Sequence, residues 1–410
     1  MRLIRGMTRQ TKKYDNTGSK GVIMIGVLFV LLFLGILLTI TYLRLDSEFA
    51  GTIAQSKSTR SLFIAEAGIE RAVSILRTNP GWRAGFAGEP LIDAAGAAAG
   101  FYTVTFVSEV YNTPWRTLEI TSIGRLAAGD PDCQRTIYAK INVANPAEFF
   151  AFTTDKTVVS NGATIQNGSL YAREIEFYAC PAYLNNLVIT QPTYYTTNYT
   201  QKDPNGAGNA PDIDIVTIPT RLDKPVGFPS LDADNYKRLA KDNGGRYYPN
   251  NKTFDNGIDL EDGENGVIFV EGDIYIKGEI ADPVTVVATG NIYITGDITW
   301  TENGEGDPVG KLGLFSKKDI YIAESAPENL SVRGLLISEG IFEALGTKGS
   351  KGILDFDGSM VIKGDKGKPY GAVDLSVYGV RNYNYDSSLL QFPALPFVTY
   401  IANLDSWKEK

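Results

Sequence analysis

The 410-residue chain contains no histidine and only two cysteines. The lack of histidine excludes imidazole-based catalytic triads, imidazole general acids and most zinc sites. The sequence also lacks a P-loop and a glycine fingerprint for dinucleotides. We therefore expect a protein that is not an enzyme and that holds no cofactor and no metal. A β-helical polysaccharide-active enzyme could work with Asp, Lys and Arg, but no spacing of these residues singles out a catalytic set.

Acidic residues outnumber basic ones beyond the first 20 positions. Those positions carry six basic side chains and one acidic one, whereas the whole chain has a net charge of −8, so the region from Gly21 onward carries −13. Negative charge of this size opposes binding to nucleic acid and to anionic lipid headgroups. We therefore expect no nucleic-acid partner.

Residues 21–43 form an uncharged, largely apolar run of 23 residues. A helix of about 20 such residues spans a bilayer, whereas the apolar part of a secretory signal is about half that length. No small-residue cleavage site follows the run before Arg44. Because the preceding residues are basic, the positive-inside tendency keeps them in the cytoplasm. The sequence predicts a single-pass membrane protein whose C-terminal part is extracytoplasmic.

Apolar residues continue at helical spacing beyond this run. Leu45, Phe49 and Ile53 recur every four residues. A second set, Leu62, Ala65, Ile69, Ala72 and Leu76, recurs at spacings of three and four. This periodicity predicts one helix over residues 22–77, about 84 Å long, that residues 78–81 (TNPG) stop. Residues 54–61 have no apolar stripe, so we expect them to be solvated or packed against a neighbouring subunit.

Three segments after the helix alternate apolar with polar residues, as half-buried strands do. They are residues 100–107, 117–123 and 135–143. We expect them to form a small antiparallel sheet whose apolar face covers the C-terminal half of the helix, in an α+β head.

Two motifs carry a family resemblance. A basic residue and a glycine, Lys20 and Gly21, stand directly before the apolar run, and residues 62–72 read LFIAEAGIERA. The first is similar to type IV prepilin leaders, and the second resembles the AEAGIERA segment of PilX-like minor pilins. The resemblance implies cleavage after Gly21 by a prepilin peptidase, which leaves Val22 as the mature N-terminus. It also implies a bacterial cytoplasmic (inner) membrane, and other pilins or pseudopilins as partners through the helix. Major pilins have glutamate at the fifth mature position, where this chain has Gly26, as do many PilX-like proteins.

An internal repeat marks the larger remainder of the chain. The segment 272–278 (GDIYIKG) recurs as 290–296 (GNIYITG) and more loosely as 318–323 and 358–364, with 340–343 between the last two. Short strands with turn residues at a period near 20 predict a parallel β-helix or β-solenoid, in which each coil buries its inward residues on the next. We expect inward ladders of Ile274, Ile276, Ile292, Ile294, Ile320 and Ile322.

Two further parts of the remainder are assigned from pattern. Residues 167–172 and 175–178 are interpreted as opening coils of the same stack. Residues 191–256 interrupt the repeat and are predicted to be an ordered insertion with a short helix at 233–240. Residues 381–386 followed by 392–396 resemble the close of an uncharacterised β-helical domain that follows PilX-like N-termini.

These inferences combine into one architecture. The predicted fold is α+β: a long N-terminal transmembrane helix with a small antiparallel sheet, a pilin-like head, followed by a parallel β-helix. Its parts are a cytoplasmic leader (1–21), the extended helix (22–79), the β head (80–146) and the β-solenoid (147–400), with the insertion near 191–256. The implied function is a minor pilin or pseudopilin of a type IV pilus or related secretion filament, at the tip or in assembly priming.

A membrane-anchored surface binding module, or adhesin, is the alternative function. Its ligand would be a glycan or a protein of unknown identity, and tyrosines are the candidate contacts, although tyrosine in turns is commonly structural. They are Tyr194, Tyr195, Tyr199, Tyr247 and Tyr248.

Two residue groups could have local chemistry. Cys133 and Cys180 lie on the predicted oxidising side of the membrane, where one disulfide would contribute about 4 kcal/mol, and free thiols are the alternative. An acidic cluster lacks the alternating spacing of a calcium loop, so it is interpreted as a solvated turn. Its members are Asp255, Asp259, Glu261, Asp262 and Glu264.

Overall fold

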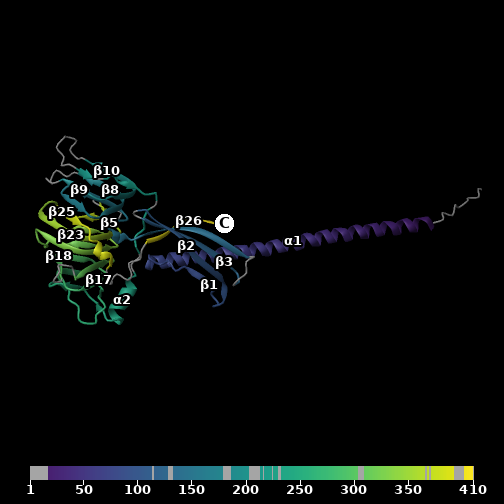
Figure 1. The fold of residues 1–410 in the computed structure, drawn as a ribbon, viewed down its shortest axis with the longest axis horizontal. Coiled ribbons are helices and arrows are strands. Elements are labelled where there is room, and N and C mark those ends of the chain that lie inside the picture. The colour runs from purple at the N-terminus through teal and green to yellow at the C-terminus, as the bar shows by residue number, and fades with distance from the viewer. Residues whose placement is uncertain are drawn as a thin grey trace, which may run out of the picture.

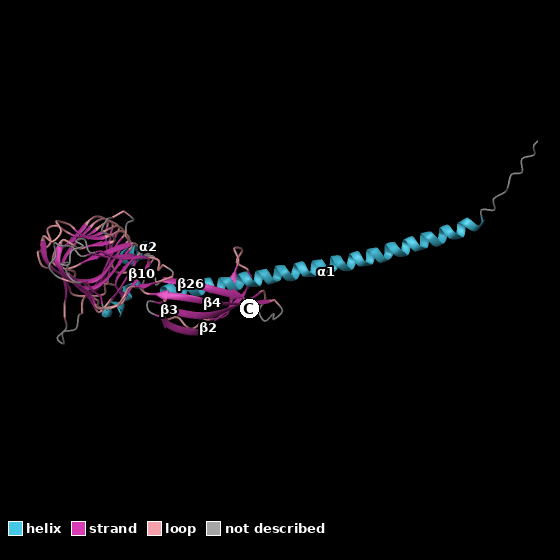
Figure 2. Cartoon of the chain, turned by 90° about the horizontal axis from the view of Figure 1, so that it is seen from above, coloured by secondary structure: helices cyan, strands magenta, loops and turns pink. Residues whose placement is uncertain are grey.

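The protein has one very long helix and two β-rich regions (Figures 1 and 2). A computed structural model provides the coordinates. It describes residues 17–112, 115–127, 133–178, 186–202, 213–215, 217–223, 225–229, 232–302, 309–364, 367–368, 371–391 and 401–409. The helix projects from a small antiparallel sheet, and a large parallel sheet lies beyond the other end of that small sheet.

The helix α1 (Thr17–Thr78) is continuous, as the periodicity predicts. It begins inside the predicted leader, five residues before Val22. It ends where Asn79 donates its backbone N–H to Ile75 O (2.7 Å) and Pro80 follows, because proline has no N–H to continue the ladder. Residues 1–16, which hold most of the leader's basic side chains, lie outside the described residues.

A five-stranded antiparallel sheet packs on the C-terminal part of α1 (Figure 2). The three predicted strands are confirmed, and the sequence analysis missed the two outer ones. In spatial order the strands are β1 (Phe86–Ile92), β2 (Ala98–Asn112), β3 (Trp115–Arg125), β4 (Gln134–Ala144) and β26 (Ile401–Glu409). The strand β26 comes from the extreme C-terminus, after the entire parallel sheet.

The helix stripe from Ala65 to Leu76 is buried against this sheet, as predicted. The contact begins earlier than the sequence indicates. Ser61 is fully buried, so its assignment to a segment outside the head core is wrong. The reason is Gly124 on β3: a Cβ atom there would lie 2.1 Å from Ser61 O and 2.5 Å from Ala65 N. Because glycine has no Cβ, the helix backbone approaches the strand closely.

Residues 149–384 contain a 21-stranded sheet in which every pairing between named strands is parallel. The pairings fall into three ladders. The first contains β13 (Arg246–Tyr248), β15 (Val267–Val270), β17 (Pro283–Ala288), β19 (Lys311–Ser316), the second halves of β21 (Leu330–Ser338) and β23 (Lys351–Ile362), then β5 (Phe149–Thr153), β8 (Ser169–Tyr178), β10 (Thr193–Lys202) and β12 (Thr220–Arg221).

The second ladder contains β14 (Lys252–Phe254), β16 (Ile274–Ile280), β18 (Ile292–Trp300), β20 (Ile320–Ile322), β22 (Phe342–Ala344) and β24 (Val373–Asp374). The third contains the ends of β16 and β18, the first halves of β21 and β23, then β25 (Tyr378–Asn384), β7 (Ala163–Gln166), β9 (Leu187–Ile189) and β11 (Ile213–Ile215). Outside these ladders, β6 (Lys156–Ser160) pairs with the end of β8.

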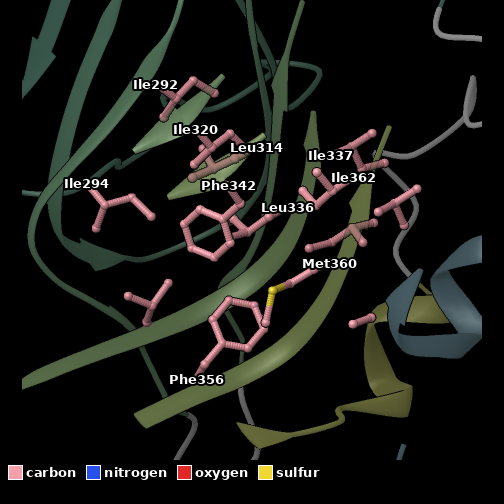
Figure 3. Close-up of a cluster of buried hydrophobic side chains, with 14 of the residues drawn as sticks. Ile292, Ile294, Leu314, Ile320, Leu336, Ile337, Phe342, Phe356, Met360 and Ile362 are labelled. Atoms are coloured by element: carbon pink, nitrogen blue, oxygen red, sulfur yellow. The ribbon is translucent and has the colours of Figure 1, made fainter. Parts of the chain in front are cut away.

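The predicted isoleucine columns are confirmed on the second ladder. Ile274, Ile292 and Ile320 are in register with one another, and the residues two positions later form a second column. All are at most 1% exposed. Figure 3 shows Ile292, Ile294 and Ile320 close to Phe342, which continues the first column. Stacking on its equivalents covers each aliphatic side chain along the direction of the ladder.

The last proposed repeat was assigned wrongly. Residues 358–364 resemble the repeat, but Met360 pairs with Leu336 on the first ladder, not with the isoleucines of the second. Residues 340–343 instead hold the next position of the column. Residues 358–364 share with the repeat a glycine at each end and apolar residues at the third and fifth positions. They differ at the fourth position, where Val361 is fully buried and the repeat has an outward tyrosine.

The stacking order differs from the chain order. The strands β5 and β7 pair with β23 and β25, the last strands of the repeat region, rather than with its beginning. The chain therefore enters the stack in the middle, at β5, and adds strands in one direction as far as β12. It then crosses to the opposite end of the stack, at β13, and adds strands back toward the point of entry. We call the β23–β5 and β25–β7 contacts the seam. The predicted opening coils thus lie in the same stack, but next to its final strands.

The interpretation of residues 191–256 as one insertion is wrong in part. β10, β11 and β12 continue the stack, and β13 and β14 begin its other half. Among the described residues of this range, 222–223, 225–229 and 232–245 cross the stack, and they contain the predicted helix as α2 (Ala233–Asp242).

This crossing segment covers an outer apolar column of the first ladder. The column runs in register through Phe269, Val287, Phe315, Ile337, Val361, Phe152 and Tyr171, each at most 2% exposed. Tyr236 of α2 packs edge-on against Phe315, with ring centroids 5.4 Å apart. Toward the other end, the backbone N–H of Val226 donates to Tyr171 Oη (2.8 Å). The segment therefore covers a face that would otherwise be exposed.

We predict that the isoleucine columns, and not the turn charges, stabilise the parallel sheet. Ile292→Ala removes a fully buried side chain and should cost about 2 to 5 kcal/mol. Asp262→Ala, at an exposed turn, should stay within about 0.5 kcal/mol. Thermal unfolding of the full-length protein in detergent measures both, and equal melting temperatures for the two variants would contradict the prediction.

We also predict that β26 is required for a stable head. Ala402 is fully buried in the head core, and its carbonyl accepts from the Arg77 guanidinium (3.4 Å). Ala402→Asp would bury a charge, so it should release β26 and accelerate amide exchange along β4. Lys408→Asp, at an exposed position of the same strand, is the matched control. Unchanged protection of β4 in the Ala402→Asp variant would refute this role.

Candidate functional site

The first half of α1 exposes a long run of apolar side chains. Met24–Arg77 contains an 18-residue window with a mean hydropathy of 2.8, none of it buried in the chain. Among the described residues it is the one helix long and apolar enough to cross a membrane. No other element in the described part of the chain covers this surface.

The exposed apolar stripe extends past the predicted bilayer span. Leu45, Phe49 and Ile53 are 48%, 65% and 56% exposed. The head first contacts α1 at Ser58, whose hydroxyl oxygen accepts a hydrogen bond from Arg135 Nε (2.7 Å). About 20 Å of helix between Arg44 and Ser58 therefore carries apolar side chains that the described part of the chain leaves uncovered.

The predicted processing residues lie near the start of α1. The backbone of Gly21 and Val22 is helical. A Cβ atom at Gly26 would contact nothing within 4 Å, so packing inside the chain does not require glycine there. Cleavage after Gly21 stays a prediction.

The proposed disulfide is not tested. Cys133 lies just before β4, at the end of the strand far from the passage into β5, and its carbonyl accepts a hydrogen bond from Ser61 Oγ. Cys180 lies outside the described residues. Residues 392–396, which contribute to the predicted close of the domain, lie outside them as well.

The acidic cluster contains carboxylates that are bound to basic residues. Glu264 pairs with Arg246 (2.6 Å), and its hydrogen bond from that guanidinium holds the pKa of the carboxyl below its usual value. Asp255 pairs with Lys277 (3.3 Å). No group of three or more acidic or cysteine side chains within the described ranges is arranged to hold a metal ion.

The candidate tyrosines do not form one site. Tyr194, Tyr195 and Tyr199 lie on β10, whereas Tyr247 and Tyr248 lie on β13. Eight strand spacings, about 38 Å, separate these strands on the first ladder. Their rings pack locally: Tyr194 is 6% exposed, and Tyr247 stacks on Phe269. They are therefore structural in large part.

A different tyrosine array follows the isoleucine columns. Tyr275, Tyr293 and Tyr321 stack face to face, with centroids 4.9 and 5.4 Å apart. Burial, and then the hydrogen bond to Asp319, raise the pKa of Tyr321. The repeated IYI motif contains the signal for this array, because its middle residue always points outward.

Side chains before each IYI motif connect successive strands. Asn251 Oδ1 accepts from Asp273 N, Asp273 Oδ1 accepts from Asn291 N, and Asn291 Oδ1 accepts from Asp319 N, at 2.8, 2.7 and 3.2 Å. This Asp/Asn ladder fixes the turns and was not recognised in the sequence. The Asp or Asn that directly precedes each Ile was the available signal.

A polar groove lies on the third ladder, across the seam. Two columns of outward side chains line it, and each column is in register over four strands. The first column is Ser331, Asp355, Asn382 and Thr164, and the second is Arg333, Asp357, Asn384 and Gln166. The hollow has a volume of about 310 Å³. Between the columns, Val332, Phe356 and Ile165 point into the core.

Sequence reasoning missed this groove. Each strand contributes a polar–apolar–polar triplet, such as residues 355–357 (DFD) and 382–384 (NYN). Such triplets occur in any half-buried strand. Only the seam places residues 164–166 beside residues 382–384, which lie more than 200 positions later.

Comparison with known proteins gives little further evidence. No protein-family model matches the chain, and no curated protein matches it either. Among solved structures, the chain is similar to the competence-associated pilin ComZ from Thermus thermophilus, with 13% identity. That match covers 86% of this chain and 97% of ComZ, with a TM-score of 0.33. A score this low does not establish a shared fold, so no conclusion about this chain rests on it.

We predict that calcium does not stabilise the acidic cluster, because Arg246 already compensates Glu264. Addition of calcium should leave the melting temperature of the full-length protein unchanged, as should Asp262→Ala in its presence. Magnesium serves as the ionic-strength control. If calcium alone raised the melting temperature and Asp262→Ala removed the increase, the cluster would be a metal site.

Proposed function

We propose that the protein is a minor pilin or pseudopilin-like structural subunit of a type IV pilus or related secretion filament. The observation that carries this proposal is the division of α1 at Ser58. Before that residue the helix is exposed, with a continuous apolar run up to Leu43 and an apolar stripe up to Ile53, and after it the helix packs on a small antiparallel sheet. A subunit that is first stored in a membrane and then inserts its helix among others requires this division. The LFIAEAGIERA segment, which resembles PilX-like pilins, lies on the packed half.

The proposed location in the cell follows from the same helix. Its apolar half would span the bacterial cytoplasmic (inner) membrane once, with the basic leader in the cytoplasm and both β-rich regions outside. Its partners would be other pilins or pseudopilins, and a prepilin peptidase would process it. The proposal includes no nucleic-acid partner, cofactor or catalytic activity.

A tip or assembly-priming position is the finer part of the proposal. The parallel sheet is much larger than the head to which it is joined (Figure 1). Repeated subunits in a shaft pack closely around their helices, and a domain of this size on every head would obstruct that packing. Gly26 also lacks the carboxylate that major pilins have at the fifth mature position. A rare subunit at one end of the filament satisfies both constraints.

We further propose that the three ladders close into a β-solenoid. From β13 to β25, successive repeats contribute strands to the first, second and third ladders in the same order, which is the pattern of a coil with three faces. The inward columns would then form one shared core. The buried cluster in Figure 3 draws side chains from the first and second ladders, such as Leu336 and Ile294, which supports this closure.

A surface binding module is the second candidate function. The polar groove favours it, because a purely structural sheet face does not require a hollow between its side chains. The two functions are compatible, since a subunit at the end of a filament presents its outermost domain to the surroundings.

We predict that the mature protein starts at Val22. Mass spectrometry of the protein from its native membrane should find this N-terminus, because the prepilin peptidase is expected to cut after Gly21. Gly21→Leu should block processing, whereas Gly26→Ala should not, since a Cβ atom at position 26 contacts nothing in the chain. An intact Met1, or a start beyond Leu43, in the unmodified protein would refute the pilin proposal.

A further inference from the structure

We propose that the polar groove binds an uncharged, hydroxyl-rich glycan chain. Its residues, the two columns of the third ladder, play no part in the helix-based assembly proposed above. The inference therefore stands or falls independently of the filament proposal.

The groove presents a regular array of hydrogen-bonding groups. Register places the columns on four neighbouring strands, so equivalent side chains repeat every 4.8 Å or so across the strands. The two columns are two residues apart along each strand, about 7 Å. The array therefore extends roughly 14 Å across the strands. A surface of this shape fits an extended chain of sugar rings rather than a single small molecule.

Neighbouring side chains hold the polar groups in place. Asn382 Nδ2 donates to Asp355 Oδ1 (2.7 Å), Asn167 Nδ2 donates to Asn384 Oδ1 (2.8 Å), and Arg333 pairs with Asp357 (3.3 Å). Each contact fixes an orientation and leaves capacity for a ligand. A carboxylate has two acceptor oxygens, and an amide has two N–H donors and a carbonyl acceptor. Oriented donors and acceptors side by side match the adjacent hydroxyl groups of a sugar ring.

Charge determines the class of glycan. The groove contains two carboxylates and one guanidinium, and Glu302 lies 3.7 Å from the same guanidinium. Arg333 is therefore compensated, and the site has no uncompensated positive charge for an anionic polysaccharide. Asp355 and Asn382 are exposed, so their polar atoms face a ligand directly. The observations favour a neutral glycan bound by hydrogen bonds.

Binding without cleavage is the expected activity. Glycoside hydrolysis requires one carboxyl group that stays protonated as a general acid and a second that acts as base or nucleophile. Asp355 accepts a hydrogen bond from an amide, and Asp357 pairs with a cation. The two carboxylates of the groove therefore hold neighbouring side chains in place, which is a binding role.

The test uses the full-length protein in phosphocholine detergent, because a maltoside detergent would itself supply sugar. Calorimetric titration with cellohexaose, maltohexaose and chitohexaose should detect binding of at least one. Polygalacturonate, an anionic polymer, should not bind. The double variant Asn382→Ala/Asn384→Ala and the single variant Gln166→Ala remove amides without changing charge. Loss of two hydrogen bonds should weaken binding by about tenfold or more.

Matched controls separate a binding effect from a folding effect. Gln201→Ala removes an exposed amide from β10 of the same sheet, away from the groove, and should bind like the unmodified protein. The melting temperatures of all variants should agree. If none of the three neutral hexasaccharides binds, or if the groove variants bind as tightly as Gln201→Ala, the proposal is overturned. The appearance of shorter sugars, or binding of polygalacturonate alone, would overturn it as well.

Discussion

The seam between β23 and β5 is the contact on which the arrangement of this protein depends. It joins strands about 200 residues apart and lets the stack grow in two directions from its point of entry. Buried polar contacts hold it. Ser359 Oγ donates to Phe149 O (2.6 Å), and the buried guanidinium of Arg381 donates to Ser160 Oγ (2.9 Å) and to backbone carbonyls. A buried cation bonded in this way costs several kcal/mol to leave unpaired, so the seam has little freedom to shift register.

The seam also explains how the two β-rich regions are joined. The chain passes from β4 through η1 (Pro146–Glu148) into β5, and it leaves the stack after β25 through η2 (Ser387–Gln391). The two short helices contact each other, so entry and exit lie side by side. From there the C-terminus reaches β4 and adds β26 to the head. The head and the parallel sheet are therefore connected twice, and an ion pair between Arg116 and Glu148 (3.6 Å) supports the joint.

Because the stack grows in two directions from its entry point, a long connection has to link its two ends, and the crossing segment is that connection. After β12 the chain must return along the whole stack to reach β13. The outer column of the first ladder, from Phe269 to Tyr171, is as apolar as a core, and the return path buries it with Tyr236 and Val226. The same seam produces the polar groove, because it places β7 beside β25. The order of the strands, the covering of the outer apolar column and the polar groove therefore all follow from the seam.

The sequence pattern was sufficient to predict an element where apolar residues recur at a spacing of a few residues. The sequence determined α1, the three inner strands of the head and the inward isoleucines of the second ladder, since helical spacing and strand alternation are properties of neighbouring residues. It could not separate residues 358–364 from the repeat, because the two share glycine at both ends and apolar residues at the third and fifth positions. Nor could it indicate β26, the seam or the groove. Those features depend on pairing between segments hundreds of residues apart, and backbone hydrogen bonds between parallel strands are the same for every sequence. Which strand lies beside which was decided by the tertiary structure alone, through the burial that each pairing completes.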